Sequence, residues 1–221
     1  MALLLMGPPG GGKGVQSKIL SAKYGWPQIS TGDLLRQQIK DCTELGLKVE
    51  NLTKSGQLVP DSIILDMIFE RIQQPDCQKG FILDGCPRTL VQGQLLDQHF
   101  QSHHIKTVVL VLDVPDEQIK ERLLHRIVCE KCGTPYHTKT LPPKQEGICD
   151  RCQGNVIKRP DDSDAIISDR LKIYHQQTEP LFEFYSSKGY LTRIDGTLSK
   201  EEVSEKIEQV LTHYTCETTC Q

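Results

Sequence analysis

Five glycines and one lysine follow the first hydrophobic run of the chain, in the segment GPPGGGKG at residues 7–14. Gly7, Gly12 and Lys13 match the phosphate-binding pattern GxxxxGK followed by Ser or Thr. Glycines let backbone N–H groups turn toward phosphate oxygens, the next helix adds its positive dipole end, and the lysine bridges phosphates. A tight strand-to-helix turn explains the glycines but not the lysine. Because Gly14 follows Lys13, a metal ion here must rely on water and on carboxylates elsewhere.

Four of the nine cysteines form a second chemical pattern. CEKC (residues 129–132) and CDRC (residues 149–152) give the spacing C-x2-C-x16-C-x2-C, which is typical of a zinc site. Four thiolates fill the tetrahedral positions of Zn²⁺, so the spacing predicts a structural ion with no open coordination site. Two disulfides are the weaker alternative in a reducing compartment. The nearby His137 is expected to be a polar residue rather than a ligand.

Length and charge restrict the class of protein. A chain of 221 residues suffices for one core with insertions. The formal net charge of −3 gives no basic field for nucleic acid or a membrane surface. The longest apolar runs, such as Thr107–Asp113, are strand-sized, and the N-terminus lacks a secretory signal pattern. We therefore expect a cytoplasmic protein without nucleic-acid or membrane partners.

The glycine-rich segment belongs to an alternation of short apolar runs and helical patterns. The runs that predict strands are Leu3–Met6, Pro27–Ser30, Phe81–Asp84, Thr107–Asp113 and Tyr190–Asp195. The predicted helices are Lys13–Tyr24, Asp61–Gln73, Pro115–Ile127, Ala165–Tyr185 and Lys200–Tyr214. This order predicts an α/β fold with a five-stranded parallel sheet wrapped by helices. Ligands of such sheets bind at the carboxyl ends of the strands.

Two segments interrupt the alternation, and we expect both to be insertions in one core. Residues 30–59 are helical and polar, and residues 122–159 carry the cysteines. The core then consists of residues 1–29, 60–121 and 160–221. The cysteine segment holds eight basic and three acidic residues, a formal charge of +5. A cationic flap of this kind suits a polyphosphate site. We assign no role to the tail TCETTCQ.

Five motifs, in order and covering nearly the whole chain, resemble those of adenylate kinases. They are GPPGGGKG, STGDLLR (residues 30–36), GQLVPD (residues 56–61), GFILDGCPRT (residues 80–89) and RPDD (residues 159–162). The cysteine segment resembles the long, metal-binding lid of many bacterial members. The resemblance implies a P-loop nucleoside monophosphate kinase fold, a monomer, and the reaction ATP + AMP ⇌ 2 ADP with magnesium. It makes residues 30–59 the AMP-binding insertion and residues 122–159 a zinc-binding lid.

The resemblance also assigns residues to the two nucleotides. The ATP-binding set is Gly10, Gly11, Gly12, Lys13, Gly14, Val15, Arg126, Pro135, Tyr136 and Leu198. The AMP-binding set is Thr31, Arg36, Gln57, Leu58, Val59, Gly85, Cys86, Pro87, Arg88, Gln92, Arg159 and Arg170. Phosphoryl transfer crowds negative charge, so arginine forks are expected around it. The catalytic set is Lys13, Arg88, Arg126, Arg159, Arg170 and Asp84, with Asp84 as the magnesium partner through water. The metal ligands are Cys129, Cys132, Cys149 and Cys152.

Two positions depart from the family pattern, and three rival functions compete with it. Val15 replaces a threonine, which removes a hydroxyl near the donor phosphates, and Cys86 replaces a phenylalanine behind the AMP loop. We expect Cys86 to be a small buried hydrophobe rather than a reactive thiol. The nearest rival is a kinase for UMP, CMP or GMP, although Thr31 and Gln92 resemble the pair that selects adenine. The two remaining rivals are a zinc-ribbon switch that binds nucleic acid and a nucleotide-binding regulator without turnover.

Overall fold

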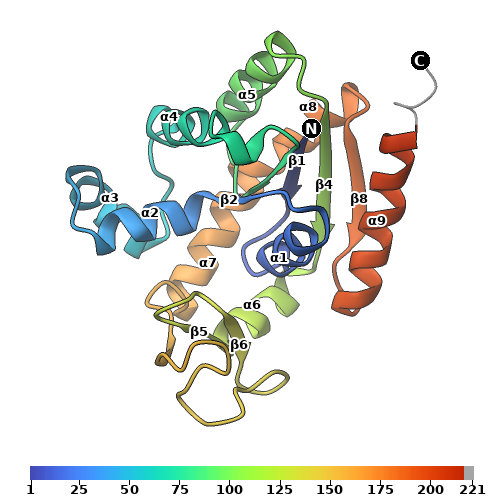
Figure 1. Ribbon diagram of the computed structural model, residues 1–221. Helices are drawn as coiled ribbons and strands as arrows, with labels where there is room; N and C mark the ends of the chain where they lie inside the picture. Colours follow the sequence, from blue (N-terminus) through green and yellow to red (C-terminus); the bar gives the residue numbers. More distant parts are fainter. Residues whose placement is uncertain (217–221) are drawn as a thin grey trace.

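A five-stranded parallel sheet forms the centre of the protein, which we describe from a computed structural model (Figure 1). The structure describes residues 1–216, and their strand order is β2-β3-β1-β4-β8. The strands are β1 (Ala2–Met6), β2 (Gln28–Ser30), β3 (Phe81–Asp84), β4 (Thr107–Asp113) and β8 (Leu191–Asp195). This sheet confirms the predicted α/β fold class.

The central strands are apolar on both faces because helices cover both sides. Leu3 of β1 lies beside Ile82 of β3 and Val108 of β4, and all three are fully buried. Buried parallel strands need no polar face, which explains their continuous hydrophobic runs. All five strands run in one direction, so their carboxyl ends share one edge. The glycine-rich loop follows β1 at that edge.

Two layers of helices enclose the sheet and make two hydrophobic cores. One core joins the sheet to α1 (Lys13–Tyr24) and α9 (Lys200–Cys216), and the other joins it to α4 (Asp61–Ile72), α5 (Leu90–Ser102) and α8 (Pro180–Ser187). A 3₁₀ turn, η1 (Pro75–Cys77), precedes β3. None of the helices in residues 1–216 has both the length and the apolar character needed to cross a membrane.

The first insertion is a pair of packed helices, α2 (Thr31–Lys40) and α3 (Glu44–Ser55). The Ser30 and Thr43 hydroxyls accept hydrogen bonds from backbone N–H groups at the starts of these helices. At Gly46 an added Cβ would lie 2.1 Å from the carbonyl oxygen of Gln38. Glycine therefore allows the two helices to meet at backbone distance, away from the sheet (Figure 1).

The cysteine-bearing segment is a small antiparallel sheet beyond α6 (Asp116–Leu124). Its strands, in the order β6-β5-β7, are β5 (Arg126–Cys129), β6 (Pro135–His137) and β7 (Val156–Lys158). The prediction of a helix over Pro115–Ile127 is therefore wrong at its end. Ile127 pairs with Tyr136 on one side and Lys158 on the other. This tertiary pairing overrides the helical pattern that continues past Leu124.

The predicted helix Ala165–Tyr185 is divided into three parts. They are α7 (Asp164–Ile173), the π-helix η2 (Tyr174–Thr178) and α8 (Pro180–Ser187). Pro180 stands at the first position of α8, where its missing N–H is tolerated. A π-helical segment changes the angular step between residues, so it changes which faces α7 and α8 present.

Candidate active site

The glycine-rich loop closes around the side chain of Lys13. Lys13 Nζ donates hydrogen bonds to the carbonyl oxygens of Gly7 (2.9 Å) and Pro8 (2.8 Å). Gly7 has a φ of +133°, and a Cβ there would lie 2.5 Å from Leu112 O, so only glycine fits against β4. Gly12, with a φ of +95°, is the N-cap of α1. The positive end of the helix therefore opens onto the loop.

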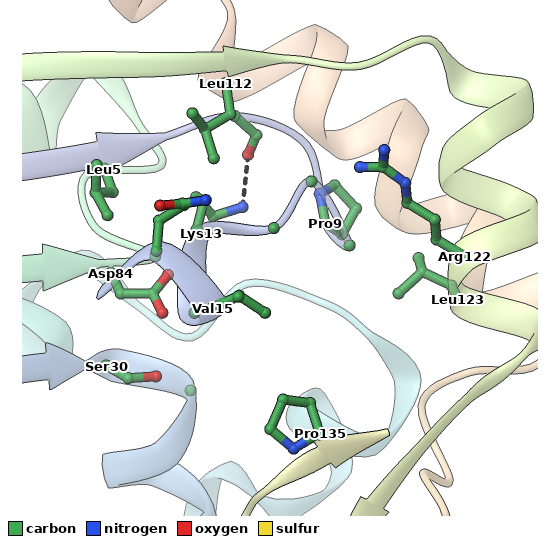
Figure 2. A pocket seen from close by; sticks show the side chains of 18 of the residues that line it. Leu5, Pro9, Lys13, Val15, Ser30, Asp84, Leu112, Arg122, Leu123 and Pro135 are labelled. Atoms are coloured by element: carbon green, nitrogen blue, oxygen red, sulfur yellow. Dashed lines mark hydrogen bonds between the residues drawn. The ribbon is translucent and has the colours of Figure 1, made fainter. Parts of the chain in front are cut away.

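Lys13 and Asp84 lie beside one another at the base of the loop (Figure 2). Burial lowers the pKa of Lys13 to about 8, and the nearby Asp84 carboxylate opposes this shift. Burial raises the pKa of Asp84, against the opposing effects of Lys13 and of a 3.0 Å hydrogen bond from Gln28 Nε2. Each of the two charges thus supports the other. Phosphate oxygens beside Lys13 Nζ would favour its protonated form further.

Gly14 leaves space for the Asp84 carboxylate. A Cβ at this position would lie 3.3 Å from Asp84 Oδ2, which is tighter than an ordinary contact. A serine or threonine after Lys13 would therefore crowd the carboxylate. Carboxylate oxygens and water suit Mg²⁺, and Asp84 faces the cavity. Asp84 is therefore the residue of this edge whose carboxylate oxygens could hold a magnesium ion.

A cavity of about 530 Å³ extends from the glycine-rich loop to both insertions. Most residues of the predicted site line it: Gly10, Gly11, Gly12, Lys13, Gly14, Val15, Arg36, Leu58, Asp84, Gly85, Pro87, Arg88, Arg126, Pro135, Tyr136, Arg159, Arg170 and Leu198. The others lie outside its lining: Thr31, Gln57, Val59, Cys86 and Gln92. All of these except Gln57 are buried. Thr31 donates to the carbonyl oxygen of Gly85 and Gln92 accepts from the backbone N–H of Arg88, so both contact residues that line the cavity.

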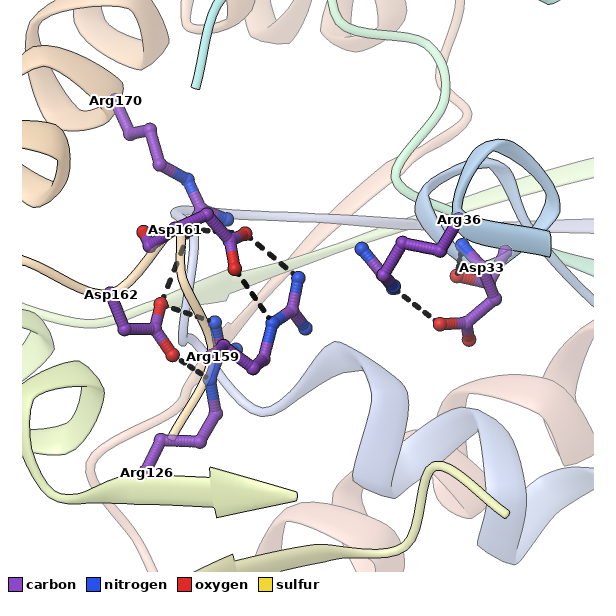
Figure 3. Close-up of polar contacts among 8 residues, drawn as sticks. Asp33, Arg36, Arg126, Arg159, Asp161, Asp162 and Arg170 are labelled. Carbon is purple, nitrogen blue, oxygen red and sulfur yellow. Dashed lines mark hydrogen bonds and ion pairs between the residues drawn. The ribbon is translucent and has the colours of Figure 1, made fainter. Parts of the chain in front are cut away.

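Two aspartates hold three of the predicted arginines (Figure 3). Arg126 donates to both carboxylate oxygens of Asp162 at 2.7 and 2.6 Å, and Arg159 donates to both of Asp161 at 2.9 and 2.8 Å. Arg170 Nη1 lies 3.2 Å from Asp161 Oδ2 and 3.4 Å from Asp162 Oδ1. A guanidinium has five N–H donors, so each fork keeps donors for a further anion.

Asp161 and Asp162 were not among the predicted site residues. Both lie in the turn between β7 and α7, and Asp162 is fully buried. Burial alone would raise the pKa of Asp161, but Arg159 and Arg170 lower it to about 2. Asp161 is therefore ionised at neutral pH and offsets the repulsion among the arginines. The motif RPDD contained a signal for these two residues, because two carboxylates closely follow Arg159, an arginine expected to bind phosphate.

Arg36 reaches the cavity from the other insertion and bonds to Asp33, three residues earlier on α2. Burial lowers the pKa of Arg36, and Arg159 lowers it further, while Asp33 opposes both effects. Arg36 and Arg159 repel each other electrostatically, because one positive charge comes from each insertion and both line the same cavity. A polyanion between them would remove this repulsion.

The four cysteines of the predicted metal set form a cluster. Their sulfur atoms all lie within 4.8 Å of one another, with Cys129 and Cys152 Sγ atoms 3.4 Å apart and those of Cys132 and Cys149 3.6 Å apart. Tetrahedral zinc requires sulfur separations of about 3.8 Å, so the cluster has the dimensions of such a site. Tyr136 Oη donates to Cys149 Sγ at 3.4 Å. His137 lies outside the cluster, as expected.

A phosphate-binding loop on a parallel sheet, an arginine-lined cavity and two insertions define the class of P-loop nucleoside monophosphate kinases. The model of the family described as adenylate kinase matches residues 5–190. Proteins named adenylate kinase from Clostridium tetani and Archaeoglobus fulgidus are each 45% identical over 96% of this chain and 98% of their own length. The adenylate kinase from Carboxydothermus hydrogenoformans is 47% identical over 96% of this chain and 99% of its own length. The chain belongs to the adenylate kinase family.

Proposed function

We propose that this protein transfers the terminal phosphoryl group of ATP reversibly to AMP, giving two ADP, with magnesium. The observation that carries the proposal is the convergence of cationic side chains from separate segments on one cavity. They come from the glycine-rich loop, α2, the loop after β3, both ends of the lid, and α7: Lys13, Arg36, Arg88, Arg126, Arg159 and Arg170. Such a site suits a reaction that brings the phosphates of two nucleotides together.

The donor nucleotide occupies the part of the cavity between the glycine-rich loop and the lid. The backbone of Gly10–Val15 cradles its phosphates, and Lys13 neutralises them. Arg126, Pro135 and Tyr136 close over it from the lid, and the backbone at Leu198 contacts the adenine. Val15 contributes a backbone N–H here, so the missing threonine hydroxyl removes only a side-chain contact.

The acceptor nucleotide occupies the side nearer α2 and the loop after β3. Arg36 and Arg88 hold the AMP phosphate, with Arg159 and Arg170 directed toward the transferred group. The adenine lies against Thr31, the backbone of Gln57–Val59, and Gln92. Thr31, Val59 and Gln92 are buried and do not line the cavity in this structure, so contact with the base requires a local rearrangement when AMP binds.

The protein contributes positioning and charge to the chemical step. An AMP phosphate oxygen attacks the terminal phosphorus of ATP as the bond to the ADP oxygen breaks, and the arginine forks stabilise the negative charge that spreads over the equatorial oxygens. Asp84 would hold a magnesium ion through water, and the ion would supply positive charge to neutralise the donor phosphates. Closure of the lid excludes water and so prevents hydrolysis.

A panel of acceptors tests this proposal. With MgATP as donor, we expect AMP to give the highest kcat/KM among AMP, GMP, CMP and UMP. A clear preference for UMP would support the rival kinase, and nucleotide binding without turnover would support a regulator. A salt-dependent gel shift with nucleic acid would support the zinc-ribbon switch.

We also propose that the cysteine cluster holds a structural zinc ion. The sulfur separations support it, and four protein ligands leave no position for substrate. The lid segment is too short and polar to bury a core of its own, since its buried cluster centres on Cys129, Tyr136 and Cys149. The metal therefore supplies the stability that packing does not.

Replacing one ligand should release the metal and weaken the lid. For Cys132→Ser we expect less than the wild-type content of about one zinc per chain, and a lid destabilised by about 2–4 kcal/mol. Metal analysis and thermal unfolding measure the two effects. Cys42→Ser is the matched control, because Cys42 is exposed and outside the cluster. A metal-free form that keeps its melting temperature yet loses turnover would indicate a catalytic metal instead.

We further propose the division into three functional parts: a core of residues 1–29, 60–121 and 160–221, an AMP-binding insertion at 30–59, and a zinc-binding lid at 122–159. We also propose that the protein works as a monomer, as the resemblance to the family implies. A reducing compartment such as the cytoplasm suits four free thiols that serve a metal.

A further inference from the structure

The carboxamide of Gln92 is enclosed by hydrogen-bonding partners of fixed polarity. The side chain is buried, with 2% of its surface exposed. Its Oε1 accepts from the backbone N–H of Arg88 at 2.7 Å and from the Cys86 thiol at 3.3 Å. Its Nε2 donates to Oδ1 of Asp61 at 2.8 Å. Asp61 is the first residue of α4, and it was not predicted to belong to the site.

These partners determine which end of the amide faces which way. A backbone N–H can only donate, and an ionised carboxylate can only accept. A reversed amide would place Nε2 against the Arg88 N–H and Oε1 against the Asp61 carboxylate, so both contacts would become repulsive. Burial raises the pKa of the Cys86 thiol, which therefore keeps its proton and remains a donor to Oε1. Three contacts thus favour one orientation.

The remaining hydrogen-bonding capacity of Gln92 is a single donor. Oε1 has two lone pairs, which Arg88 and Cys86 use, while Nε2 has two N–H groups and Asp61 uses one. We propose that Asp61 is a positioning residue that orients the Gln92 side-chain amide. The AMP site then offers an N–H to the base, and it selects a base whose ring nitrogen can accept that hydrogen bond. This inference rests on the proposed binding of AMP beside Gln92.

The chemistry of purine bases makes the selection measurable. The N1 atom of adenine is an acceptor, whereas N1 of hypoxanthine carries a hydrogen. AMP and IMP differ only in the hydrogen-bonding pattern of the N1 and C6 edge of the base, so comparing them tests what the site offers to that edge. In the orientation that Asp61 favours, the free Gln92 N–H pairs with AMP and opposes IMP. A site built to pair with one partner leaves its polar group unpaired with the other.

Asp61→Asn is the decisive variant, since it keeps the size and hydrogen bonding of the side chain but removes its acceptor-only character. An asparagine can turn its oxygen toward Nε2 or its nitrogen toward Oε1, so the preference for one orientation of Gln92 then rests on the Arg88 N–H and the Cys86 thiol alone. We expect the ratio of kcat/KM for AMP to that for IMP to fall about tenfold, while the KM for ATP stays within about twofold. A purely structural role for Asp61 would leave the ratio unchanged.

Thr89→Val is the matched control. Thr89 Oγ1 donates to the other oxygen of Asp61 at 3.0 Å and accepts from the backbone N–H of Gln92. This variant therefore loosens the junction of α4 and α5 without removing a hydrogen bond of the Gln92 side-chain carboxamide. We expect a lower melting temperature and an unchanged AMP-to-IMP ratio. An equal fall of the ratio in Thr89→Val would overturn the inference, because the effect would then arise from the junction.

Direct binding separates this inference from the proposed activity. Calorimetry with AMP and IMP, without ATP, gives the ratio of dissociation constants for the wild type and for Asp61→Asn. A ratio that Asp61→Asn leaves within about twofold of the wild-type value overturns the inference, even if the enzyme makes ADP. If Asp61→Asn brings the dissociation constants for AMP and IMP closer together but the wild-type protein forms no ADP, the inference is supported and only the proposed reaction is contradicted.

Discussion

Replacing Lys13 by methionine should lower kcat for ADP formation by about a hundredfold or more. Methionine keeps the length and apolar stem of the side chain but removes the charge beside the donor phosphates. The protein should still fold, because burial already disfavours this charge and lowers the pKa of Lys13 to about 8. Its melting temperature should fall modestly, because Asp84 and the carbonyl oxygens of Gly7 and Pro8 lose a partner. A coupled assay of ADP formation, together with thermal unfolding, measures both effects.

Lys23→Met is the matched control for this experiment. Lys23 lies on the same helix, is exposed, and pairs at the surface with Glu208. We expect it to leave kcat near that of the wild type. If Lys13→Met retained turnover within about fivefold of the wild type, Lys13 would not belong to the catalytic set.

The second large effect is expected at Arg88. Arg88→Ala should reduce kcat by about a hundredfold or more and raise the KM for AMP. The side chain lines the cavity, and its Nε donates to the carbonyl oxygen of Gly85 at 2.7 Å, which aims the guanidinium from the loop after β3. In the proposed complex, removing it would leave the AMP phosphate without the fork that we expect to hold it during transfer. Steady-state kinetics with varied AMP separates kcat from KM.

Two further variants show whether the fork or the charge matters at this position. Arg88→Lys keeps the positive charge but loses the planar pair of donors, so we expect turnover between that of Arg88→Ala and the wild type. Arg71→Ala is the control, because Arg71 lies in the last turn of α4, pairs with Asp76 and does not line the cavity. Equal losses in Arg71→Ala and Arg88→Ala would point to a general effect on folding.

The fold could be predicted best where burial is complete. Phe81–Asp84 and Thr107–Asp113 are strands with the predicted bounds, because strands buried on both faces contain continuous apolar runs. Lys13–Tyr24 is likewise a helix with the predicted bounds. The two segments that we expect to be insertions stand out in the sequence because their composition interrupts the alternation of strands and helices. The last five residues of the tail TCETTCQ lie outside the described residues.

Helix α5 was not predicted, because its buried face is unusually polar. It packs Gln92, Gly93 and Asp97 inward together with two large apolar residues. At Gly93 an added Cβ would lie 2.4 Å from Leu181 Cδ2, so the glycine permits close contact with α8. Hydrophobic periodicity in the sequence places Gln92, Gly93 and Asp97 on the solvent-facing side of a helix. Only the tertiary partners explain why they are buried.

The candidate site divides in the same way. Local motifs predict the glycine-rich loop, the arginines and the four cysteines, because their spacing along the chain is itself the signal. The roles of Asp61, Asp161 and Asp162 depend on partners that are distant in sequence or on burial. For example, Asp162 meets Arg126 across the whole cysteine segment. Charge pairing of this kind has no periodic signature in a single sequence.

The π-helix η2 has a consequence for the angular direction of the side chains around it. Each residue of an α-helix turns the chain by about 100°, so one inserted or deleted residue in Tyr174–Thr178 would rotate α8 by that angle relative to α7. Arg170 on α7 faces the cavity, whereas Tyr185 on α8 faces the core. Between them, Thr178 Oγ1 donates to the carbonyl oxygen of Arg88 at 2.9 Å. The π-helix therefore fixes the angle between the side of α7 that faces the cavity and the side of α8 that faces the core. We expect insertions and deletions there to be far less tolerated than in exposed loops.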